Sequence, residues 1–196
     1  MNSEDKRIRK TKKILKETLI SILDKKPFEQ ISVKEICDAS DTSRVTFYTH
    51  YSDKYELADD IFNDMIQIAK DDYYRLQKEN NPGNDFTLRY CNLMDCILNM
   101  YYGQIRFFSH TVASESPYLN FSFYKYALQY VEFHIQKHNE EIFKYSPKKI
   151  SGFLCYGLWG FLNESRAEKS SLEQVRGELQ EIVKDIFKSK ILTFNI

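Results

Sequence analysis

Side chains suited to contacting DNA are concentrated in one short stretch of the chain, residues 42–54. The stretch reads TSRVTFYTHYSDK and combines hydroxyl groups with a guanidinium, phenols and an imidazole. Hydroxyl and phenol groups hydrogen bond readily to phosphate oxygens, whereas the guanidinium of Arg44 can donate two hydrogen bonds to O6 and N7 of guanine. These residue types predict a surface that binds double-stranded DNA.

A second candidate for phosphate contact is the basic amino-terminal segment, residues 1–16. It carries seven basic and two acidic side chains, although the net charge of the whole chain is zero. Closely spaced cations can neutralise phosphates and release counterions from DNA. A basic run is also a common solubilising tail, and the sequence leaves both interpretations open.

No pattern in the sequence predicts an enzyme, a cofactor or a metal site. Nucleophile-elbow, P-loop and dinucleotide-binding glycine motifs do not occur, and the four cysteines show no CxxC pairing. His134 and His138 have the i, i+4 spacing of a chelating pair, but neither an HExxH arrangement nor a third ligand accompanies them. We therefore expect this helix face to be solvated.

The hydrophobic pattern predicts an all-helical chain. Apolar residues recur at three- and four-residue spacing, and the clearest interruption is at residues 80–83. Capping boxes at residues 32–35 and 170–173 mark two helix starts. Helices are expected over residues 6–25, 33–39, 43–50, from Asp53 to the interruption, and over 85–102, 104–113, 118–143, 147–167 and 171–191.

Two of these helices, over residues 33–39 and 43–50, form a helix-turn-helix unit. The turn between them contains Asp41, which tolerates a left-handed backbone. Phe47 and Tyr51 are four residues apart and are expected to face the core. The polar side chains of the second helix then remain outside, where a short helix can enter the major groove.

Residues 31–54 resemble the amino-terminal signature of TetR-family transcriptional regulators, and the resemblance extends from residue 8 to about residue 62. Asp41 departs from the pattern, because glycine is frequent in this turn. Tyr51 stands where phenylalanine is commoner, and its hydroxyl needs a partner or solvent. The residues that match are Val33, Ile36, Cys37, Ser43, Thr46, Phe47, Tyr48, His50, Tyr51 and Lys54.

The resemblance implies an all-α, nine-helix fold with a three-helix DNA-binding domain at residues 1–55 and a helical effector-binding and dimerisation domain at residues 56–196. It implies that Thr46, Tyr48, His50 and Lys54 contact the operator backbone and that residues 43–45 lie against bases or phosphates. The residues expected to bind DNA are Ser32, Thr42, Ser43, Arg44, Val45, Thr46, Tyr48, Thr49, His50 and Lys54.

Aromatic residues are dense in the carboxy-terminal region, and ligand pockets are largely apolar and aromatic. They predict a small-molecule effector site, whereas the alternative is that each aromatic residue belongs to ordinary core. The residues expected to line the site are Tyr101, Phe107, Tyr124, Tyr130, Tyr156 and Trp159.

The segment 150–162, ISGFLCYGLWGFL, is the most apolar stretch of the chain. Each of its glycines weakens a helix by about 1 kcal/mol relative to alanine, which is reasonable where another helix approaches closely. The resemblance implies that this segment and the helix over 171–191 form half of an intermolecular four-helix bundle. The alternative is that the two helices pack only within one subunit. The expected dimer residues are Phe153, Gly157, Gly160, Leu179, Val183 and Ile186.

These observations predict a cytoplasmic, homodimeric, ligand-responsive transcriptional regulator that binds a palindromic operator. A repressor is favoured over an activator. No run of apolar residues is long enough for a transmembrane helix and no signal peptide is apparent, so no membrane partner is expected. One alternative is a TetR-like co-activator whose carboxy-terminal domain binds another protein. Another is a helical interaction module that has lost DNA binding.

Overall fold

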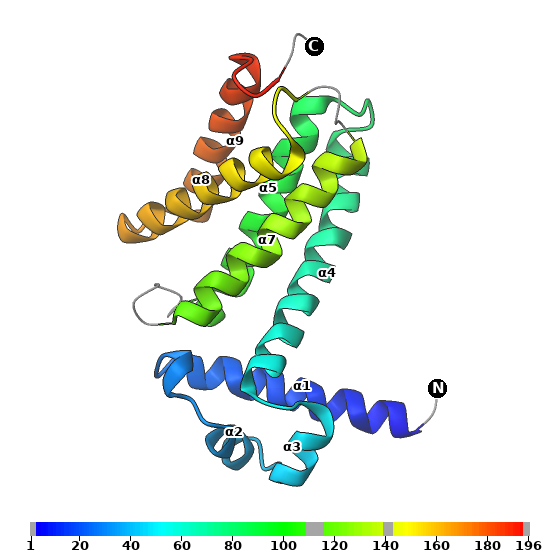
Figure 1. Ribbon diagram of the computed structural model, residues 1–196, viewed down its shortest axis with the longest axis vertical. Helices are drawn as coiled ribbons and strands as arrows, with labels where there is room; N and C mark the ends of the chain where they lie inside the picture. Colours follow the sequence, from blue (N-terminus) through cyan, green and yellow to red (C-terminus); the bar gives the residue numbers. More distant parts are fainter. Residues whose placement is uncertain (1–2, 109–115, 139–142, 194–196) are drawn as a thin grey trace. The chain divides into compact units, whose positions relative to one another are not determined.

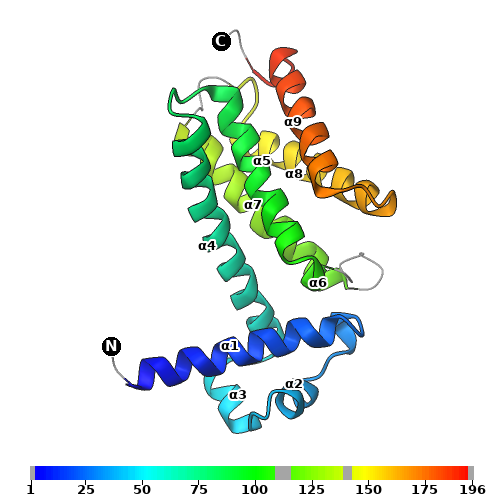
Figure 2. The ribbon, with the colours of Figure 1, turned by 180° about the vertical axis from the view of Figure 1, so that it is seen from behind.

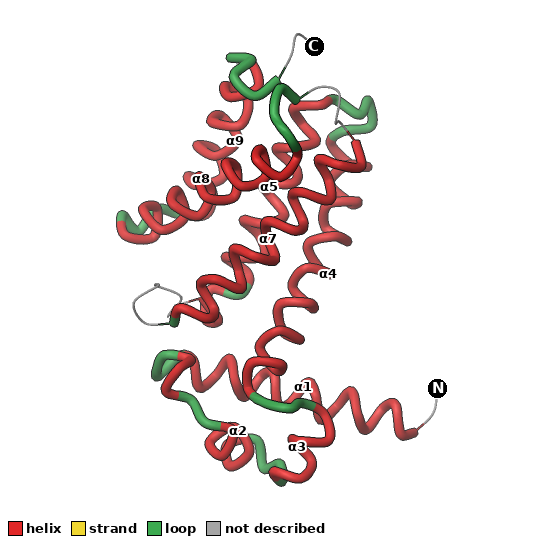
Figure 3. Tube along the Cα trace, in the orientation of Figure 1, coloured by secondary structure: helices red, strands yellow, loops and turns green. Residues whose placement is uncertain are grey.

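The computed structural model describes residues 3–108, 116–138 and 143–193, most of which are helical (Figure 1, Figure 3). Within these ranges there is no β-strand, and a single antiparallel bridge joins Phe143 and Thr193. The helices are α1 (Ser3–Leu23), the 3-10 turn η1 (Phe28–Gln30), α2 (Val33–Ala39), α3 (Arg44–His50), α4 (Lys54–Asn80), α5 (Phe86–Gly103), α6 (Ile105–Phe108), α7 (Pro117–His138), α8 (Pro147–Ala167) and α9 (Leu172–Lys188).

The predicted all-helical class is confirmed, but the predicted helix count needs a correction. α6 is a single turn of four residues, so the described ranges hold eight helices of seven residues or more rather than nine. The helix expected over residues 104–113 is described only as α6, and its remainder lies outside the described residues. None of the helices in the described ranges is both long and apolar enough to cross a lipid bilayer.

The chain divides into two compact units. The first comprises Met1–Met65 and Gln104–Phe123, and the second comprises Ile66–Gly103 and Tyr124–Ile196. Helices α4 and α7 therefore each contribute one end to each unit. A functional division at residue 55 remains a prediction.

The first unit is built on the apolar stripe of α1. Leu15, Leu19 and Leu23 recur every four residues and are completely buried. Pro27 lies shortly after the end of α1, at a position where its missing N–H would prevent the helix from continuing. It is the residue that precedes η1. Helix α1 packs against α2 and α6, and α2 packs against α3. This packing holds the two short helices of the helix-turn-helix.

Serine side chains cap α2, α3 and α9, and the sequence predicted one of these caps, at Ser32, correctly. At α2 the predicted capping box is confirmed, with the Ser32 hydroxyl accepting from the Glu35 N–H and the Glu35 carboxylate accepting from the Ser32 N–H. At α9 the prediction was wrong by one residue. Ser171, not Ser170, caps the helix, and the Gln174 side chain turns to Glu178 instead of closing a box. Adjacent serines offer two equivalent caps, so the local pattern cannot choose between them.

The second unit is organised around α5, most of whose side chains are buried. Helix α5 lies between α4 and α9 (Figure 2). The Asn99 amide donates to Asp72 of α4 at 2.8 Å and accepts from Arg176 of α9 at 2.8 Å. Polar bonds thus fix the three helices alongside their apolar contacts.

Candidate nucleic-acid interface

Phe47 of helix α3 and Tyr51, which follows the helix, are buried, and the opposite side of α3 is exposed, as predicted. Phe47 is completely buried and Tyr51 almost so. Ser43 caps the helix, because its hydroxyl accepts a 3.0 Å hydrogen bond from the Thr46 N–H. Val45 and Tyr48 remain 79% and 57% exposed. The helix therefore presents an accessible surface on the side away from its anchor.

The turn before α3 has the backbone that the sequence predicts. Asp41 adopts a left-handed conformation with φ of 50°, a region that aspartate enters more readily than most residues. The Thr42 N–H donates to the Cys37 carbonyl oxygen, which closes the end of α2. The aspartate thus replaces the glycine that is frequent here without opening the turn.

The ten residues predicted to bind DNA differ in exposure. Thr42, Thr46, His50 and Lys54 are partly buried, and the other six, Ser32, Ser43, Arg44, Val45, Tyr48 and Thr49, are exposed. Their role in DNA binding remains a prediction.

Several hydroxyl protons on this surface are engaged within the protein. Ser32 donates to Glu35 at 2.8 Å, Thr42 to the Ser40 carbonyl at 3.3 Å and Thr49 to the Val45 carbonyl at 2.9 Å. A phosphate oxygen can only accept, so each of these hydroxyls must rotate before it can bind phosphate. Arg44 and Tyr48 are exposed and make no such bond in the described contacts, which leaves them as the best-placed donors on α3.

The start of α2 carries a strongly acidic carboxyl group. Lys26 forms an ion pair with Glu35. The hydrogen bond from Lys26, together with those from Ser32, lowers the pKa of Glu35 from 4.5 to about 2. Its charge lies in the first turn of α2, where the helix dipole favours an anion. The cap that begins the helix-turn-helix is thus ionised at neutral pH.

The basic run on α1 is partly neutralised by α4. Lys16 lies 3.0 Å from Asp60 and 2.6 Å from Asp64, and Lys12 lies 3.5 Å from Asp60. Lys13 pairs with Glu17 one turn along α1. Lys12 and Lys16 therefore help to dock α1 against α4, whereas Lys13 is paired within α1 itself. Lys6, Arg7 and Lys10 are exposed.

Tyr51 finds the partner that its hydroxyl requires. The hydroxyl donates a 2.7 Å hydrogen bond to Asp60. Burial would raise the pKa of Asp60, but the hydrogen bonds from Tyr51 and Lys16 outweigh it and lower that pKa. Burial first, and then the hydrogen bond to Asp60 and the charge of that carboxylate, raise the pKa of Tyr51, so the phenol stays protonated.

Lys54 points into the unit. Its Nζ atom lies within 3.0 Å of three main-chain carbonyl oxygens, those of Phe28, Glu29 and Ile31. The sequence pattern pointed to a phosphate contact for this lysine and did not reveal η1.

Tyr118, at the start of α7, is a second contact that the sequence did not reveal. Its ring stacks on Phe28 with centroids 5.4 Å apart, and its hydroxyl donates to Asp59 at 2.7 Å. The neighbouring Ser116 accepts a 3.0 Å hydrogen bond from the Phe28 N–H. Residues that are 59 and 88 positions apart meet here, and no local signal in the sequence marks such pairs.

The six residues predicted to bind an effector make separate contacts. The rings of Tyr124 and Tyr156 lie 4.1 Å apart, and those of Tyr101 and Trp159 lie 6.5 Å apart. Tyr130 donates to the Ala69 carbonyl. Phe107 belongs to the first unit, where it packs against Phe62 and Phe108. The effector role of these six residues remains a prediction.

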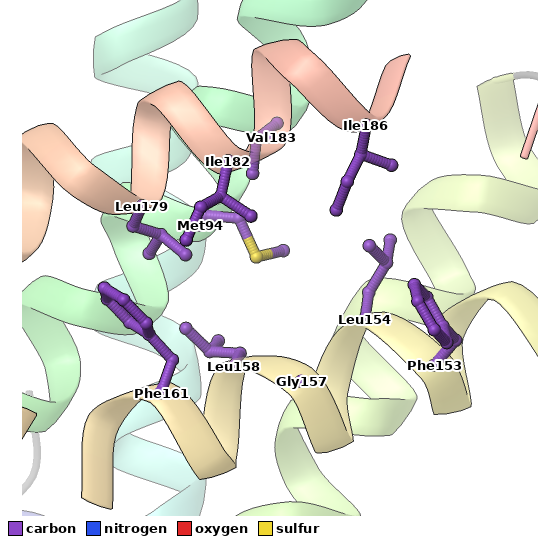
Figure 4. A pocket seen from close by; sticks show the side chains of 10 residues that line it. All are labelled: Met94, Phe153, Leu154, Gly157, Leu158, Phe161, Leu179, Ile182, Val183 and Ile186. Atoms are coloured by element: carbon purple, nitrogen blue, oxygen red, sulfur yellow. The ribbon is translucent and has the colours of Figure 1, made fainter. Parts of the chain in front are cut away.

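An apolar groove lies between α8 and α9 in the second unit. Its ten lining residues include no charged or polar side chain, and those of the two helices point toward one another across it (Figure 4). Five residues predicted for the dimer interface line the groove, namely Phe153, Gly157, Leu179, Val183 and Ile186. The sixth, Gly160, is exposed on α8.

The glycines of α8 are not required by packing within the subunit. A Cβ atom added at Gly152, Gly157 or Gly160 would meet no atom within 4 Å. Phe153, beside them, is 58% exposed. This face of α8 is therefore open in the single chain.

The expectation of a solvated helix face at His134 was wrong. His134 is only 4% exposed and packs against Tyr73 and Tyr130, with ring centroids 4.3 and 4.8 Å apart. His134 therefore belongs to the core of the second unit and not to a solvated face of α7. The side chain of His138 lies outside the described residues, and the described part of the chain contains no cluster of three potential metal ligands.

Comparison with known protein families identifies the helix-turn-helix region. Residues 17–61 match the family model described as bacterial regulatory proteins, tetR family. The match spans the end of α1, the helix-turn-helix and the start of α4. The family resemblance of this region is thus confirmed. A search of curated proteins finds no significant match.

Solved structures share the fold over nearly the whole chain. A protein assigned to the TetR family from Syntrophomonas wolfei is 12% identical, with a TM-score of 0.72, covering 95% of this chain and 99% of its own. NalD of Pseudomonas aeruginosa, a secondary repressor of the MexAB-OprM multidrug efflux pump, is 16% identical, with a TM-score of 0.61 and coverage of 99% and 100%. A TetR transcriptional regulator from Streptococcus agalactiae is 18% identical, with a TM-score of 0.58 and coverage of 92% and 97%. At these identities the likeness concerns the fold alone.

Proposed function

Because residues 17–61 match the family model of bacterial regulatory proteins of the tetR family, we propose that this chain represses transcription as a homodimer bound to a palindromic operator. A small molecule that binds the carboxy-terminal domain releases the DNA. The protein works in the cytoplasm. Residues 1–55 bind the operator, and residues 56–196 bind the effector and form the dimer.

The observation that carries the DNA-binding proposal is the orientation of α3. Phe47 is buried behind the helix, whereas Arg44 and Tyr48 are exposed on it. A guanidinium can read guanine through two hydrogen bonds, and a phenol can donate to a phosphate oxygen. Arg44 therefore supplies base recognition in this proposal, and Tyr48 supplies backbone contact.

The proposed dimer uses the face that α8 and α9 leave open. The apolar groove, the exposed Phe153 and the unfilled space at Gly157 and Gly160 all favour close approach of a second copy. Two-fold symmetry then relates the two α3 helices, and in helix-turn-helix dimers such helices enter successive major grooves about 34 Å apart. An operator with two inverted half-sites follows from this geometry.

Repression and its release are proposed from the family and from the aromatic carboxy-terminal region. NalD, whose fold this chain shares, is described as a repressor. An effector changes DNA affinity only if it binds the DNA-competent and the released conformations with different affinities. The paired aromatic residues Tyr124 and Tyr156 on α7 and α8 are the proposed starting point for locating it.

Selection of bound duplexes from a random-sequence pool tests this function. The full chain is expected to enrich a sequence with two inverted half-sites whose centres lie about one helical turn apart. Affinity for that duplex should fall steeply with salt, by about 0.9 in log K per log unit of salt for each phosphate contacted. Failure to retain any duplex at low ionic strength would exclude the proposed function.

A further inference from the structure

We propose that Lys54 is a positioning residue that joins the two ends of the helix-turn-helix, and that its ammonium group does not contact DNA phosphate. The family resemblance implies the opposite role for this residue. The inference rests on the proposed DNA-binding function, but the contacts that support it lie entirely within the first unit.

The three hydrogens of the Lys54 ammonium are all used within the protein. Its Nζ atom lies 2.8 Å from the carbonyl oxygen of Phe28, 3.0 Å from that of Glu29 and 2.8 Å from that of Ile31. A lysine ammonium has three donors and no acceptor. With three carbonyl acceptors in place, no N–H group remains for a phosphate oxygen.

The three carbonyls and Lys54 bracket the helix-turn-helix along the chain. Ile31 precedes the α2 cap by one residue, and Lys54 is the first residue of α4, just after α3. The hydrogen bonds therefore close a segment that contains α2, the turn and α3. The partners are 23 to 26 residues apart in sequence. These bonds hold the start of α4, which follows α3, against the η1 segment, which precedes α2.

The surroundings of the ammonium also favour an internal role. Its Nζ atom lies 4.7 Å from the ring centroid of Phe28 and 5.4 Å from that of Tyr55, within the range of cation–π attraction. Tyr118 packs against both rings, with centroids 5.4 and 4.7 Å away. Burial lowers the pKa of Lys54. A move toward phosphate would forfeit three carbonyl bonds and both ring contacts.

Replacement of Lys54 by arginine separates positioning from phosphate binding. Arginine binds phosphate at least as well as lysine does, so Lys54→Arg should keep operator affinity if this residue contacts the backbone. A planar guanidinium cannot direct three hydrogens from one nitrogen toward three converging carbonyls. We therefore expect Lys54→Arg to weaken binding of the selected duplex by about tenfold or more, as loss of charged hydrogen bonds does.

Lys54→Met and the control Lys34→Met provide a second measurement. Each removes one positive charge from the same region, but Lys34 is exposed on α2. Lys54→Met should lower the melting temperature by about 5 °C, which is the scale for losing one or two kcal/mol, and Lys34→Met should not. The salt dependence of Lys54→Met binding should match that of the unaltered chain.

Each result of these measurements either supports or overturns the positioning role of Lys54. Full affinity of Lys54→Arg, or a salt slope that Lys54→Met reduces by about 0.9, whatever its melting temperature, would overturn the proposal. Loss of cooperative melting in both Lys54 variants supports it, because loss of an exposed phosphate contact leaves the fold intact. If the unaltered chain binds no duplex, the proposed function fails, while the comparison of melting temperatures still tests the positioning role of Lys54.

Discussion

The Tyr51 hydroxyl donates a 2.7 Å hydrogen bond to the Asp60 carboxylate, which also forms an ion pair with the Lys16 ammonium at 3.0 Å. This pairing links the end of α3 to α4 and, through Lys16, to α1. It places a shared carboxylate behind the proposed recognition helix. The orientation of α3 therefore depends on a polar contact as well as on the apolar anchor Phe47.

Loss of the Asp60 carboxylate should cost more stability than loss of the Tyr51 hydroxyl. Tyr51→Phe leaves Asp60 with its lysines and should lower the free energy of unfolding by about 1 kcal/mol. Asp60→Ala leaves the partly buried Lys16 with a single carboxylate partner and should cost about 2–3 kcal/mol. Denaturant titration measures both, and the exposed Asp64→Ala should change stability by less than about 1 kcal/mol. Equal losses in the three variants would contradict the shared-carboxylate arrangement.

The charge of Glu35 should make α2 sensitive to acid. Its pKa in the folded chain is lowered from 4.5 to about 2, chiefly by Lys26 and then by Ser32. A lowered folded pKa means that its stabilisation is complete above 4.5 and is lost as the pH falls toward 2. The stability difference between the unaltered chain and Glu35→Gln should therefore be present at pH 7 and shrink between pH 4.5 and pH 2.

Denaturant midpoints measured across this pH range test the Glu35 prediction. Glu181→Gln is a matched control, because Glu181 is an exposed carboxylate on α9. The stability difference between the unaltered chain and Glu181→Gln should not shrink between pH 4.5 and pH 2. A Glu35→Gln difference that is constant with pH would mean that the charge of Glu35 does not support the cap.

Substitutions on α3 should separate base reading from backbone contact. Arg44→Ala should relax the preference at one base pair of each half-site, with a loss of about 1–3 kcal/mol for the preferred base. Tyr48→Phe should weaken all duplexes by a similar factor, because a phosphate contact carries no sequence information. Repeating the pool selection with each variant measures the effect. Equal weakening of all sequences by Arg44→Ala would assign Arg44 to phosphate instead.

A larger side chain at Gly157 should weaken the dimer without unfolding the chain. A Cβ atom there has no neighbour within 4 Å, and replacing a helical glycine adds up to about 1 kcal/mol of helix stability. Gly157→Leu should therefore keep or raise the melting temperature at low concentration while it raises the dimer dissociation constant. Sedimentation equilibrium measures that constant.

Gly83→Leu is the control for the dimer prediction. Gly83 lies between α4 and α5, away from the groove, and a Cβ atom there also meets nothing within 4 Å. It should leave the dissociation constant unchanged. If Gly157→Leu has no more effect than this control, the glycine face of α8 is not the interface.

The sequence by itself determined the elements whose signals are local. The Ser32–Glu35 box, the left-handed turn residue Asp41 and the buried Phe47 follow from spacings of a few residues, and each has the predicted structure. The same local string carries the family resemblance. Where two local choices were equivalent, as at Ser170 and Ser171, the pattern could not decide.

Only the tertiary structure decided which partners the polar groups find. Lys54 lies 23 residues from the Ile31 carbonyl and Tyr118 lies 59 residues from Asp59 along the chain, and helix periodicity carries no information over such separations. His134 shows the same limit, because its surroundings come from α4 as well as from its own helix. Hydrogen-bonding side chains accept many partners, so the packing of distant helices determines which of these contacts form.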